Sequence, residues 1–388
     1  MHVRIGTPVG QTGTVYASAA TATSAGAQRA SFGPQAILKG TTRNANNTGF
    51  YKFYCIAKST LGAVLTSEIA EVAVGCGAKN KDGEWLSFMC FNLGAVDTIS
   101  IAGQKGYPIG SFTNNTTDAP GLHAYIAGEE KLYGSLFQWG RVAEGHELRS
   151  YTGTTANNIA AKGAIAVADI GNGLLCSVGG TAYPYYQVRS TSTTWYGKFI
   201  YGSADWTPVP QPTSDQLWRS GRFVQNDPCA HYRADVTKTD GTTAYQEFWH
   251  NGTNTLPDSP ACVDVGTAWR TPTQDEWGEL YKGGTHSGTS ATATANTWTW
   301  YTAPAPNTSN RGFEIKPDGI TTTMFLPAGG YRYYGNGLLY YQGSYGYYWS
   351  VSISGTNAYY LYFSSGSVSP ALSSYRAYGF ALRCIKNS

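Results

Sequence analysis

Short apolar segments separated by clusters of Gly, Asn and Ser run through most of the chain, which predicts many short strands and few helices. Residues 358–363 form one strand candidate. Strict alternation of apolar with smaller or polar residues predicts further strands near the C-terminus, through Trp349, Val351 and Ile353 and through Phe380, Leu382 and Cys384. Alternation of this kind is typical of strands that turn one face toward a core.

Two segments instead have apolar residues at helical spacing. The first is residues 133–140. The second follows Thr273, a natural N-cap with Glu276 three residues later, which is the pattern of a capping box. Trp277 and two further apolar residues then fall on one face, and two glycines at 283–284 end the predicted helix.

Residues 1–75 are predicted to form a small all-β domain. Its strand candidates are residues 36–38, 51–57 and 69–74, which are rich in aromatic and β-branched residues. Residues 49–74 resemble the final hairpin of an immunoglobulin-like (Ig-like) domain, although the Cys…Trp…Cys spacing of antibody domains is absent. Composition changes at residues 75–80, so a second domain is expected over 76–388.

Composition narrows the classes of partner. The 388 residues include 47 Gly and 29 Tyr, only 13% are charged, and the formal net charge is +3. Without a basic tract, nucleic acid is not an expected partner, and without a run of 18 apolar residues no membrane insertion is expected. The first residues lack the apolar segment of a secretory signal, so the sequence gives no indication of export by that route.

The seven cysteines are scattered and form no C-x-x-C pair, so a zinc ribbon or a thioredoxin-like site is not expected. Cys229 and Cys262 could form a bridge or remain free, and both readings are open. The other cysteines are interpreted as small buried apolar residues.

Motifs for catalysis are absent: there is no G-x-S-x-G, H-E-x-x-H, P-loop or G-x-G-x-x-G sequence. His146, His231, His250 and His286 lack a partner at metal-ligand spacing and are interpreted as solvated loop residues. Asp275 and Glu276 resemble a catalytic pair, but capping explains Glu276. No enzyme activity, no cofactor and no metal are therefore predicted.

Four ordered motifs carry a resemblance that runs from about residue 76 to 388. They are Glu84-Trp85-Leu86-Ser87-Phe88-Met89-Cys90-Phe91-Asn92-Leu93-Gly94-Ala95, Tyr133-Gly134-Ser135-Leu136-Phe137-Gln138-Trp139-Gly140-Arg141, Trp269-Arg270-Thr271-Pro272-Thr273-Gln274-Asp275-Glu276-Trp277 and Gly379-Phe380-Ala381-Leu382-Arg383-Cys384. Together they resemble the Fibrobacter-type major paralogous domain, a relative of the formylglycine-generating-enzyme branch of the C-type lectin fold.

That resemblance implies an α+β, C-type lectin-like fold with small antiparallel sheets, two helices and long loops. Formylglycine-generating enzymes need a redox-active cysteine pair close to the C-terminus, where this chain has only Cys384, so their oxidase activity is not expected. The Glu-Pro-Asn and Gln-Pro-Asp motifs of calcium-dependent sugar binding are absent as well.

Within that fold, the C-terminal segment resembles the variable proteins of diversity-generating retroelements. In those systems template adenines are copied with errors, so AAC codons give Asn, Tyr, Ser and a restricted set of others, but never Lys, Glu, Gln, Met or Trp. Residues 331–380 contain 13 Tyr and 10 Ser but no Lys, Glu or Met, and the resemblance places the single Gln and the single Trp in fixed motifs.

The resemblance divides this segment into predicted ligand-binding positions and a fixed frame. The predicted ligand-binding residues are Tyr331, Tyr333, Tyr334, Asn336, Tyr340, Tyr341, Tyr345, Tyr347, Asn357, Tyr359, Tyr360, Tyr362, Ser364, Ser367, Ser369, Ser373, Ser374, Tyr375 and Tyr378. The predicted frame is Arg332, Gly337, Gln342, Gly343, Gly346, Tyr348, Trp349, Ala358, Leu361, Phe363, Val368, Pro370, Arg376, Gly379 and Phe380.

The chemistry of these residue types fits a binding surface. Tyr offers a large amphipathic contact area with two torsions to immobilise, and Ser and Asn offer adaptable hydrogen bonds, as in antibody paratopes. The alternative is that the tyrosines pack inside the sheet, because under strict alternation some in residues 358–363 must face inward.

Three functions are therefore open. The first is a variable receptor-binding protein on a phage tail or bacterial surface, recognising a protein or glycan receptor on a host or partner cell. Of these two locations, the lack of a secretory signal sequence favours the phage particle. The second is a fimbrial-tip or cell-surface adhesin of a Bacteroidales-like bacterium, with the Ig-like part as a stalk. The third is a carbohydrate-binding module with stacked tyrosines.

Overall fold

A computed structural model describes residues 2–6, 14–18, 49–58, 64–66, 70–96, 99–109, 126, 128–141, 143, 145–149, 164–166, 175–178, 185–188, 197–206, 218, 227–231, 269–282 and 296–387. The strands before residue 75 and those within 164–188 are described by their backbone alone.

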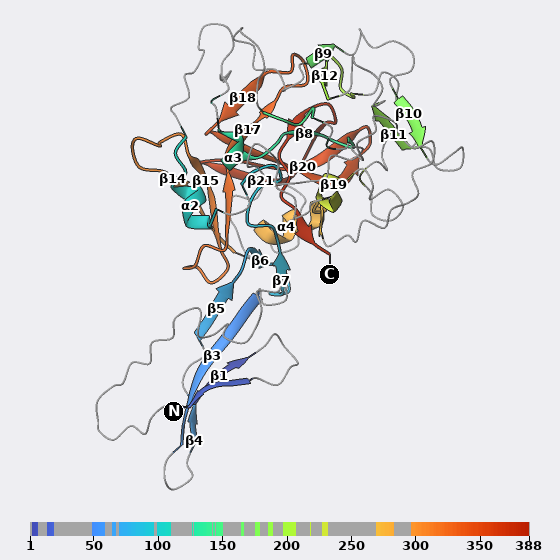
Figure 1. Cartoon of the computed structure of the whole chain (residues 1–388). Coiled ribbons are helices and arrows are strands. Elements are labelled where there is room, and N and C mark those ends of the chain that lie inside the picture. The colour runs from blue at the N-terminus through green and yellow to red at the C-terminus, as the bar shows by residue number, and fades with distance from the viewer. Residues whose placement is uncertain are drawn as a thin grey trace, which may run out of the picture.

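The N-terminal part forms one antiparallel sheet that projects from the remainder of the described chain (Figure 1). Its strands are β1 (His2–Gly6), β2 (Thr14–Ser18), β3 (Gly49–Lys58), β4 (Val64–Thr66) and β5 (Ala70–Val74). The long β3 pairs with β1 on one side and with β4 and β5 on the other. The strands expected at 51–57 and 69–74 are confirmed as β3 and β5, and the candidate at 36–38 lies outside the described residues.

From residue 75 onward the described chain is β-rich, with mostly small antiparallel sheets and few helices. A four-stranded sheet has the order β18 (Leu339–Gln342), β17 (Gly329–Arg332), β22 (Gly379–Phe380) and β8 (Phe137–Gln138). Two three-stranded sheets follow: β14 (Thr297–Thr302), β15 (Arg311–Lys316) and β16 (Met324–Pro327), and β19 (Tyr345–Ser354), β20 (Asn357–Ser364) and β21 (Ser367–Tyr375).

Smaller elements complete the described chain. The two-stranded sheets are β6 (Gly77–Lys79) with β7 (Trp85–Ser87), β13 (Trp269–Arg270) with β23 (Ile385–Lys386), β10 (Leu175–Val178) with β11 (Tyr185–Val188), and the parallel pair β9 (Ala164–Ala166) with β12 (Phe199–Tyr201). The helices are α2 (Ile101–Lys105), α3 (Glu130–Tyr133), α4 (Gln274–Lys282) and a short 3-10 helix, η5 (Pro228–His231).

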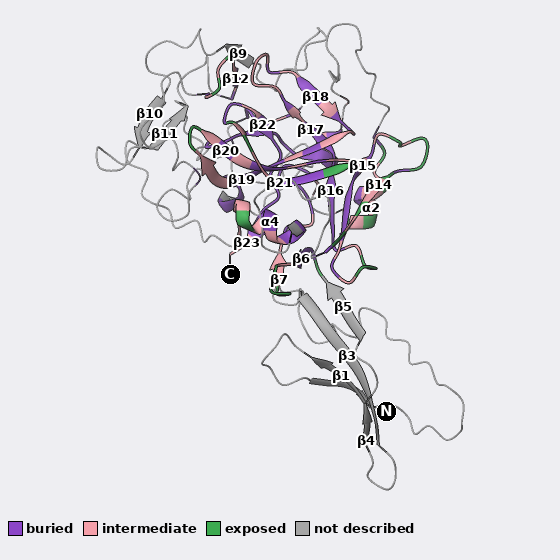
Figure 2. Ribbon diagram, turned by 180° about the vertical axis from the view of Figure 1, so that it is seen from behind, coloured by how far each residue is buried: buried purple, intermediate pink, exposed green. Residues whose placement is uncertain are grey.

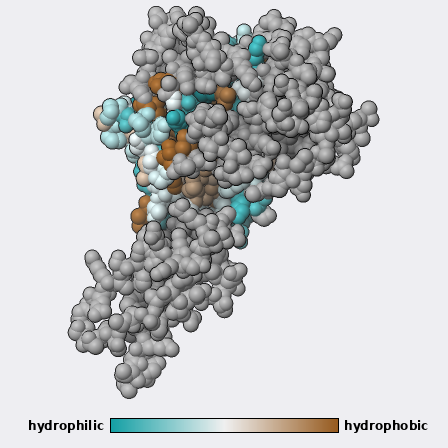
Figure 3. Space-filling model, in the orientation of Figure 1, coloured by the Kyte–Doolittle hydropathy of each residue, from teal (hydrophilic) through white to brown (hydrophobic). Residues whose placement is uncertain are grey.

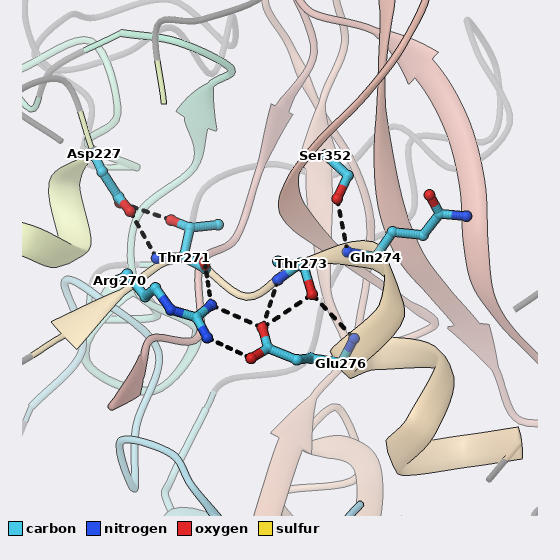
Figure 4. Close-up of polar contacts among 7 residues, drawn as sticks. All are labelled: Asp227, Arg270, Thr271, Thr273, Gln274, Glu276 and Ser352. Atoms are coloured by element: carbon cyan, nitrogen blue, oxygen red, sulfur yellow. Dashed lines mark hydrogen bonds and ion pairs between the residues drawn. The ribbon is translucent and has the colours of Figure 1, made fainter. Parts of the chain in front are cut away.

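The predicted capping box before α4 is confirmed (Figure 4). The Glu276 backbone N–H donates to Thr273 Oγ1 at 3.2 Å, and the Thr273 N–H donates to Glu276 Oε2 at 2.7 Å. Both exchanges satisfy donors that a helix start leaves unpaired. Glu276 also accepts a two-pronged hydrogen bond from Arg270, which joins the helix start to β13.

The helix predicted over 133–140 is wrong. A single helical turn, α3, ends at Tyr133, and Gly134 then adopts a φ of 70°, which L side chains disfavour. Beyond it Phe137 pairs with Phe380 and Gln138 with Gly379 in a sheet. The apolar residues at 133, 136 and 137 are all buried, but they reach the core from a helix, a loop and a strand.

The β19–β20–β21 sheet lies between two apolar cores. Trp349 and Tyr360 belong to the first core, whereas Tyr348 and Leu361 belong to the second, which α4 closes with Trp277. Figure 2 shows much of the surrounding sheet structure as buried. The strands predicted at 349–353 and 358–363 are confirmed, but the one predicted at 380–384 is shorter and ends as β22 at Phe380.

Buried indole N–H groups tie β8 to β19. Trp139 Nε1 donates to the Ser350 carbonyl at 2.9 Å, and Trp349 Nε1 donates back to the Phe137 carbonyl at 2.8 Å. Trp277 Nε1 donates to the Trp349 carbonyl at 3.3 Å. Satisfied polar groups in a core fix one arrangement of its elements, so β19 is held from both sides.

Two disulfides correct the reading of the cysteines. Cys229 pairs with Cys384, not with Cys262, which lies outside the described residues, and Cys76 pairs with Cys90. The bridge Cys229–Cys384 joins η5 to the segment after β22, across a sequence separation of 155 residues. Near it, the buried Asp227 accepts hydrogen bonds from the N–H and Oγ1 of Thr271 at 2.7 Å each (Figure 4).

The interpretation of His146 as a solvated loop residue is also wrong. Its ring is fully buried, and Nε2 accepts from the Gln138 backbone N–H at 3.1 Å. Burial and the nearby Arg141 hold the pKa of His146 well below its ordinary value. His250 and His286 lie outside the described residues, and the His231 side chain is not described.

Candidate binding surface

Two neighbouring strands carry a row of aromatic side chains on the face of the first core. Tyr347 of β19 lies opposite Tyr362 of β20, and Trp349 lies opposite Tyr360. Because side chains alternate along a strand, Tyr345, Tyr347 and Trp349 share this face. Burial decreases along it: Trp349 is fully buried, whereas Tyr347 and Tyr345 are half-buried.

Tyr331 of β17 continues the row into the four-stranded sheet. Its ring centroid lies 4.9 Å from that of Tyr347, 5.5 Å from that of Tyr378 and 5.7 Å from that of Tyr340. Further ring contacts extend the group in both directions. We call this connected set the tyrosine platform; its members are Tyr331, Tyr333, Tyr334, Tyr340, Tyr341, Tyr345, Tyr347, Tyr360, Tyr362, Tyr375 and Tyr378.

Phe380 forms the floor of the platform. Its ring centroid is 5.0 Å from that of Tyr347, 4.9 Å from that of Tyr360 and 5.2 Å from that of Tyr378, and it contacts Trp349 at 4.2 Å. Phe380 and Trp349 are both buried. The platform therefore stands on side chains that the core holds in place, which limits the torsional freedom its tyrosines would lose on binding.

Every predicted frame residue in the segment is buried. Gly346 shows why one of them is small: a Cβ there would lie about 2.0 Å from the Phe363 ring, so the ring rests directly on the backbone. Arg332 donates from Nη1 to the Gly337 carbonyl at 2.7 Å, which closes the turn between β17 and β18. Frame residues thus hold backbone and rings, while most of the predicted ligand-binding residues between them are half-buried or exposed.

A buried polar group supports the turn after β18. The amide of Gln342 donates to Glu129, and Arg149 Nη1 lies 3.8 Å from the same carboxylate oxygen. Burial raises the pKa of Glu129 to about 7, against the opposing effect of Arg149. Tyr341 has a φ of 57°, a left-handed conformation that is uncommon for an aromatic residue. Gln342 and Glu129 therefore anchor the backbone directly beside a strained tyrosine.

The platform disfavours ionised phenols. Burial, then the neighbouring tyrosines, raises the pKa of Tyr331, Tyr347 and Tyr378, and the same causes raise the pKa of Tyr360 to about 12. These side chains are neutral at physiological pH and offer hydroxyl groups beside aromatic rings.

Most of the predicted ligand-binding residues are half-buried or exposed, and Tyr375 is 40% exposed. Three are buried: Tyr340, Tyr360 and Ser369 are each 9% exposed. Within the platform Tyr333 packs on Tyr340 and Tyr347 stacks on Tyr360, and Ser369 lies opposite Tyr362 beside a strand irregularity.

Tyr359 does not join the platform. Alternation along β20 places it on the face of Leu361 and Phe363, which pack in the second core, opposite Tyr360 and Tyr362. The platform is built only from tyrosines; beside it Asn336 contacts Tyr340, and Ser364 lies opposite Tyr345. Asn357, Ser373 and Ser374 occupy the other end of β20 and β21. That any of these residues binds a ligand stays a prediction.

Two residues that support the platform could not be recognised from the sequence. Leu372 lies opposite Tyr360 and packs partly buried against the first core, beside the platform, but it looks like an ordinary core leucine in sequence. Glu129 lies 213 residues from Gln342, and a lone acidic residue does not reveal a distant amide partner.

Surface chemistry elsewhere is mixed. In the space-filling view, hydrophobic patches and hydrophilic positions alternate over the described side near α2 and β14 (Figure 3). In the described part of the chain no helix is long and apolar enough to cross a membrane. Within those same ranges no three His, Cys, Asp or Glu side chains gather as metal ligands would.

Comparison with known proteins gives one partial match. A domain family of unknown function, DUF8237, matches residues 300–385. This range starts in β14 and ends in β23, so it covers the platform together with most of its framework. No curated protein and no solved structure matches the chain.

Proposed function

We propose that this chain is a non-catalytic binding protein whose tyrosine platform recognises a protein or glycan receptor on a host or partner cell. The observation that carries the proposal is the connected set of partly exposed tyrosines above a buried aromatic floor. Tyrosine is enriched where binding energy concentrates, and a rigid base lowers the entropic cost of association.

The same arrangement supports a variable protein of a diversity-generating retroelement on a C-type lectin-like fold. Residues that adenine-directed copying can exchange are mostly half-buried or exposed, whereas those of the predicted frame are all buried. Substitutions confined to the first group would change the contact surface and leave most of the two cores unchanged, although Tyr360 itself belongs to the first core.

Reading the DNA around the gene tests this part of the proposal. A near-copy of the segment encoding residues 331–380 is expected, differing only where the copy carries adenine. The differences should fall on the predicted ligand-binding positions and spare the predicted frame. A complete genome without any such copy, or with differences spread over frame codons, would contradict the retroelement origin.

The disulfides favour display on a cell surface, the adhesin alternative, over assembly of a virion in a reducing cytoplasm. Disulfides persist in oxidising compartments and are rare in cytosolic proteins. Alkylation of the protein from its native host, without prior reduction, should leave the pairs Cys76–Cys90 and Cys229–Cys384 unlabelled in a mass spectrum. Labelling of both pairs would remove this support.

A paired-variant experiment tests binding itself. Tyr334 and Tyr375 contact each other at the rim of the platform, with ring centroids 5.0 Å apart. The double variant Tyr334→Ala, Tyr375→Ala should lose binding to a glycan array or to a panel of intact bacterial strains. Tyr301→Ala, whose half-buried ring packs on Phe325 and lies outside the predicted ligand-binding set, is the matched control and should bind as the natural chain does. Equal binding by all three proteins, or no binding in either format, would overturn the proposal.

A further inference from the structure

The segment that builds the platform, residues 331–380, brings no ionised side chain to the surface. Residues 331–380 contain no Asp, Glu, Lys or His, and their only charged residues are Arg332 and Arg376. Arg332 is fully buried and Arg376 is 2% exposed. Neither guanidinium is therefore positioned to meet a ligand at the surface.

Both arginines are engaged with the framework. Arg332 donates to the carbonyls of Gly337 and Leu148, at 2.7 and 3.3 Å. Arg376 donates to the Gly355 carbonyl at 3.0 Å, and its guanidinium lies 4.7 Å from the centre of the Trp139 ring. Their charges serve to hold turns and rings in place beneath the platform.

Phenol ionisation adds no charge under physiological conditions. The pKa of Tyr331, Tyr347 and Tyr378 is raised by burial, and the neighbouring tyrosines act in the same direction. In this segment an anionic partner would thus meet ring faces and hydroxyls but no cation, so its lost hydration would not be compensated there.

The polar groups at the platform favour a protein over a sugar. Planar amides and carboxylates can hold two neighbouring sugar hydroxyls at once, but the amide of Asn336 is already used: Nδ2 donates to the Tyr340 hydroxyl and Oδ1 accepts from the Leu338 N–H, each at 3.0 Å. Ser364 and Ser367 are paired with each other at 3.1 Å. What remains is a broad area of rings and single hydroxyls, as in a paratope.

From the lack of charge in this segment and the engaged amide of Asn336 we infer that the platform binds a protein, through a patch of that protein that has no net charge and presents aliphatic or aromatic side chains. The inference rests on the proposed function and names the partner class of the same surface. Association of this kind is driven by apolar burial, so it is insensitive to salt and has a negative heat-capacity change.

A library of short random peptides displayed on phage is the probe. Selection uses the natural chain, with counter-selection against the Tyr334→Ala, Tyr375→Ala double variant. Peptides that the natural chain and Tyr301→Ala bind, and the double variant does not, are expected to be uncharged and rich in aliphatic or aromatic residues. Their Kd should change less than about twofold between low and high salt.

Two results would overturn the inference and leave the proposed function standing. One is a set of platform-dependent peptides with a net charge, whose Kd rises about tenfold or more with salt. The other is platform-dependent binding on a glycan array while the library yields no platform-dependent peptide. Absence of platform-dependent binding in both formats would instead overturn the proposed function together with the inference.

Discussion

Tyr347 and Tyr348 are neighbours in β19, but their side chains leave the sheet on opposite faces. Tyr348 is fully buried in the second core: its hydroxyl donates to the Pro327 carbonyl at 2.7 Å and accepts from Asn92 Nδ2 at 3.1 Å. Tyr347 is half-buried and lies among other tyrosines of the platform. On one face a tyrosine is a fixed structural part, and on the other it belongs to a candidate contact surface.

What covers each face explains the difference. Helix α4 seals the second core with Trp277, whose ring centroid is 6.1 Å from that of Tyr348, and Phe363 stacks on Tyr348 at 5.7 Å. The other face is closed only over Trp349 and Phe380, and beyond them the tyrosines stack on one another. In this segment, therefore, residue type alone does not tell whether a tyrosine lies in the core or at the surface.

The largest expected effect comes from Trp349→Ala, which removes the base of the platform face. The change deletes a fully buried ring and leaves the Phe137 carbonyl without its indole donor. We expect a loss of about 3–5 kcal/mol in the free energy of unfolding, measured by urea denaturation. Tyr334→Ala at the rim is the control and should cost about 1 kcal/mol or less. Equal costs would mean that the rim is as much a part of the core as Trp349.

The neighbouring pair offers a sharper test. Tyr348→Phe removes a hydroxyl with two buried partners, so we expect a loss of about 1–3 kcal/mol. For Tyr347→Phe the expected change is within about 0.5 kcal/mol, because no hydrogen bond of its hydroxyl is found among the described residues. Urea denaturation of both variants measures the two losses. A larger loss for Tyr347→Phe than for Tyr348→Phe would contradict the assignment of the two faces.

Alkaline pH should weaken the platform face. The folded-state pKa of Tyr347 is raised above the ordinary value of 10.0, so the fold holds a proton that the unfolded chain releases. The stabilisation is complete below about pH 10 and is lost as pH rises above it, by up to about 1.4 kcal/mol per pH unit for one such group. Tyr347→Phe should lose less stability between pH 9 and 11 than the natural chain, as measured by denaturation at each pH. Parallel pH profiles would show that Tyr347 ionises freely in the fold.

The smallest expected effect concerns Tyr341. Asn tolerates the left-handed conformation at φ 57° better than Tyr, but Tyr341→Asn also removes the ring contact with Tyr345, whose centroid lies 4.6 Å away. These effects oppose each other, so the net change in the free energy of unfolding should stay below about 1 kcal/mol. Thermal denaturation checks this. A much larger loss would mean that the Tyr341 ring anchors the turn after β18.

Local sequence determined those features that depend on neighbouring residues. Thr273 and Glu276 fixed the start of α4, since a capping box needs only residues three apart. Alternation through Trp349, Val351 and Ile353 placed β19, because side-chain direction arises within one strand. The split between exchangeable and frame residues in 331–380 came instead from the resemblance to retroelement variable proteins, and it follows the observed burial closely.

Tertiary structure decided what distant segments do to each other. Cys229 joined Cys384 because the fold brings η5 beside the C-terminal segment, and the spacing of cysteines carries no such information. Residues 133–140 do not form the helix they resemble: Gly134 takes a φ of 70°, and Phe137 and Gln138 pair with the distant β22. Tyr359 and Tyr360 are adjacent residues of the same type. Their surroundings differ because their side chains leave the sheet on opposite faces, and α4 packs on only one of these faces.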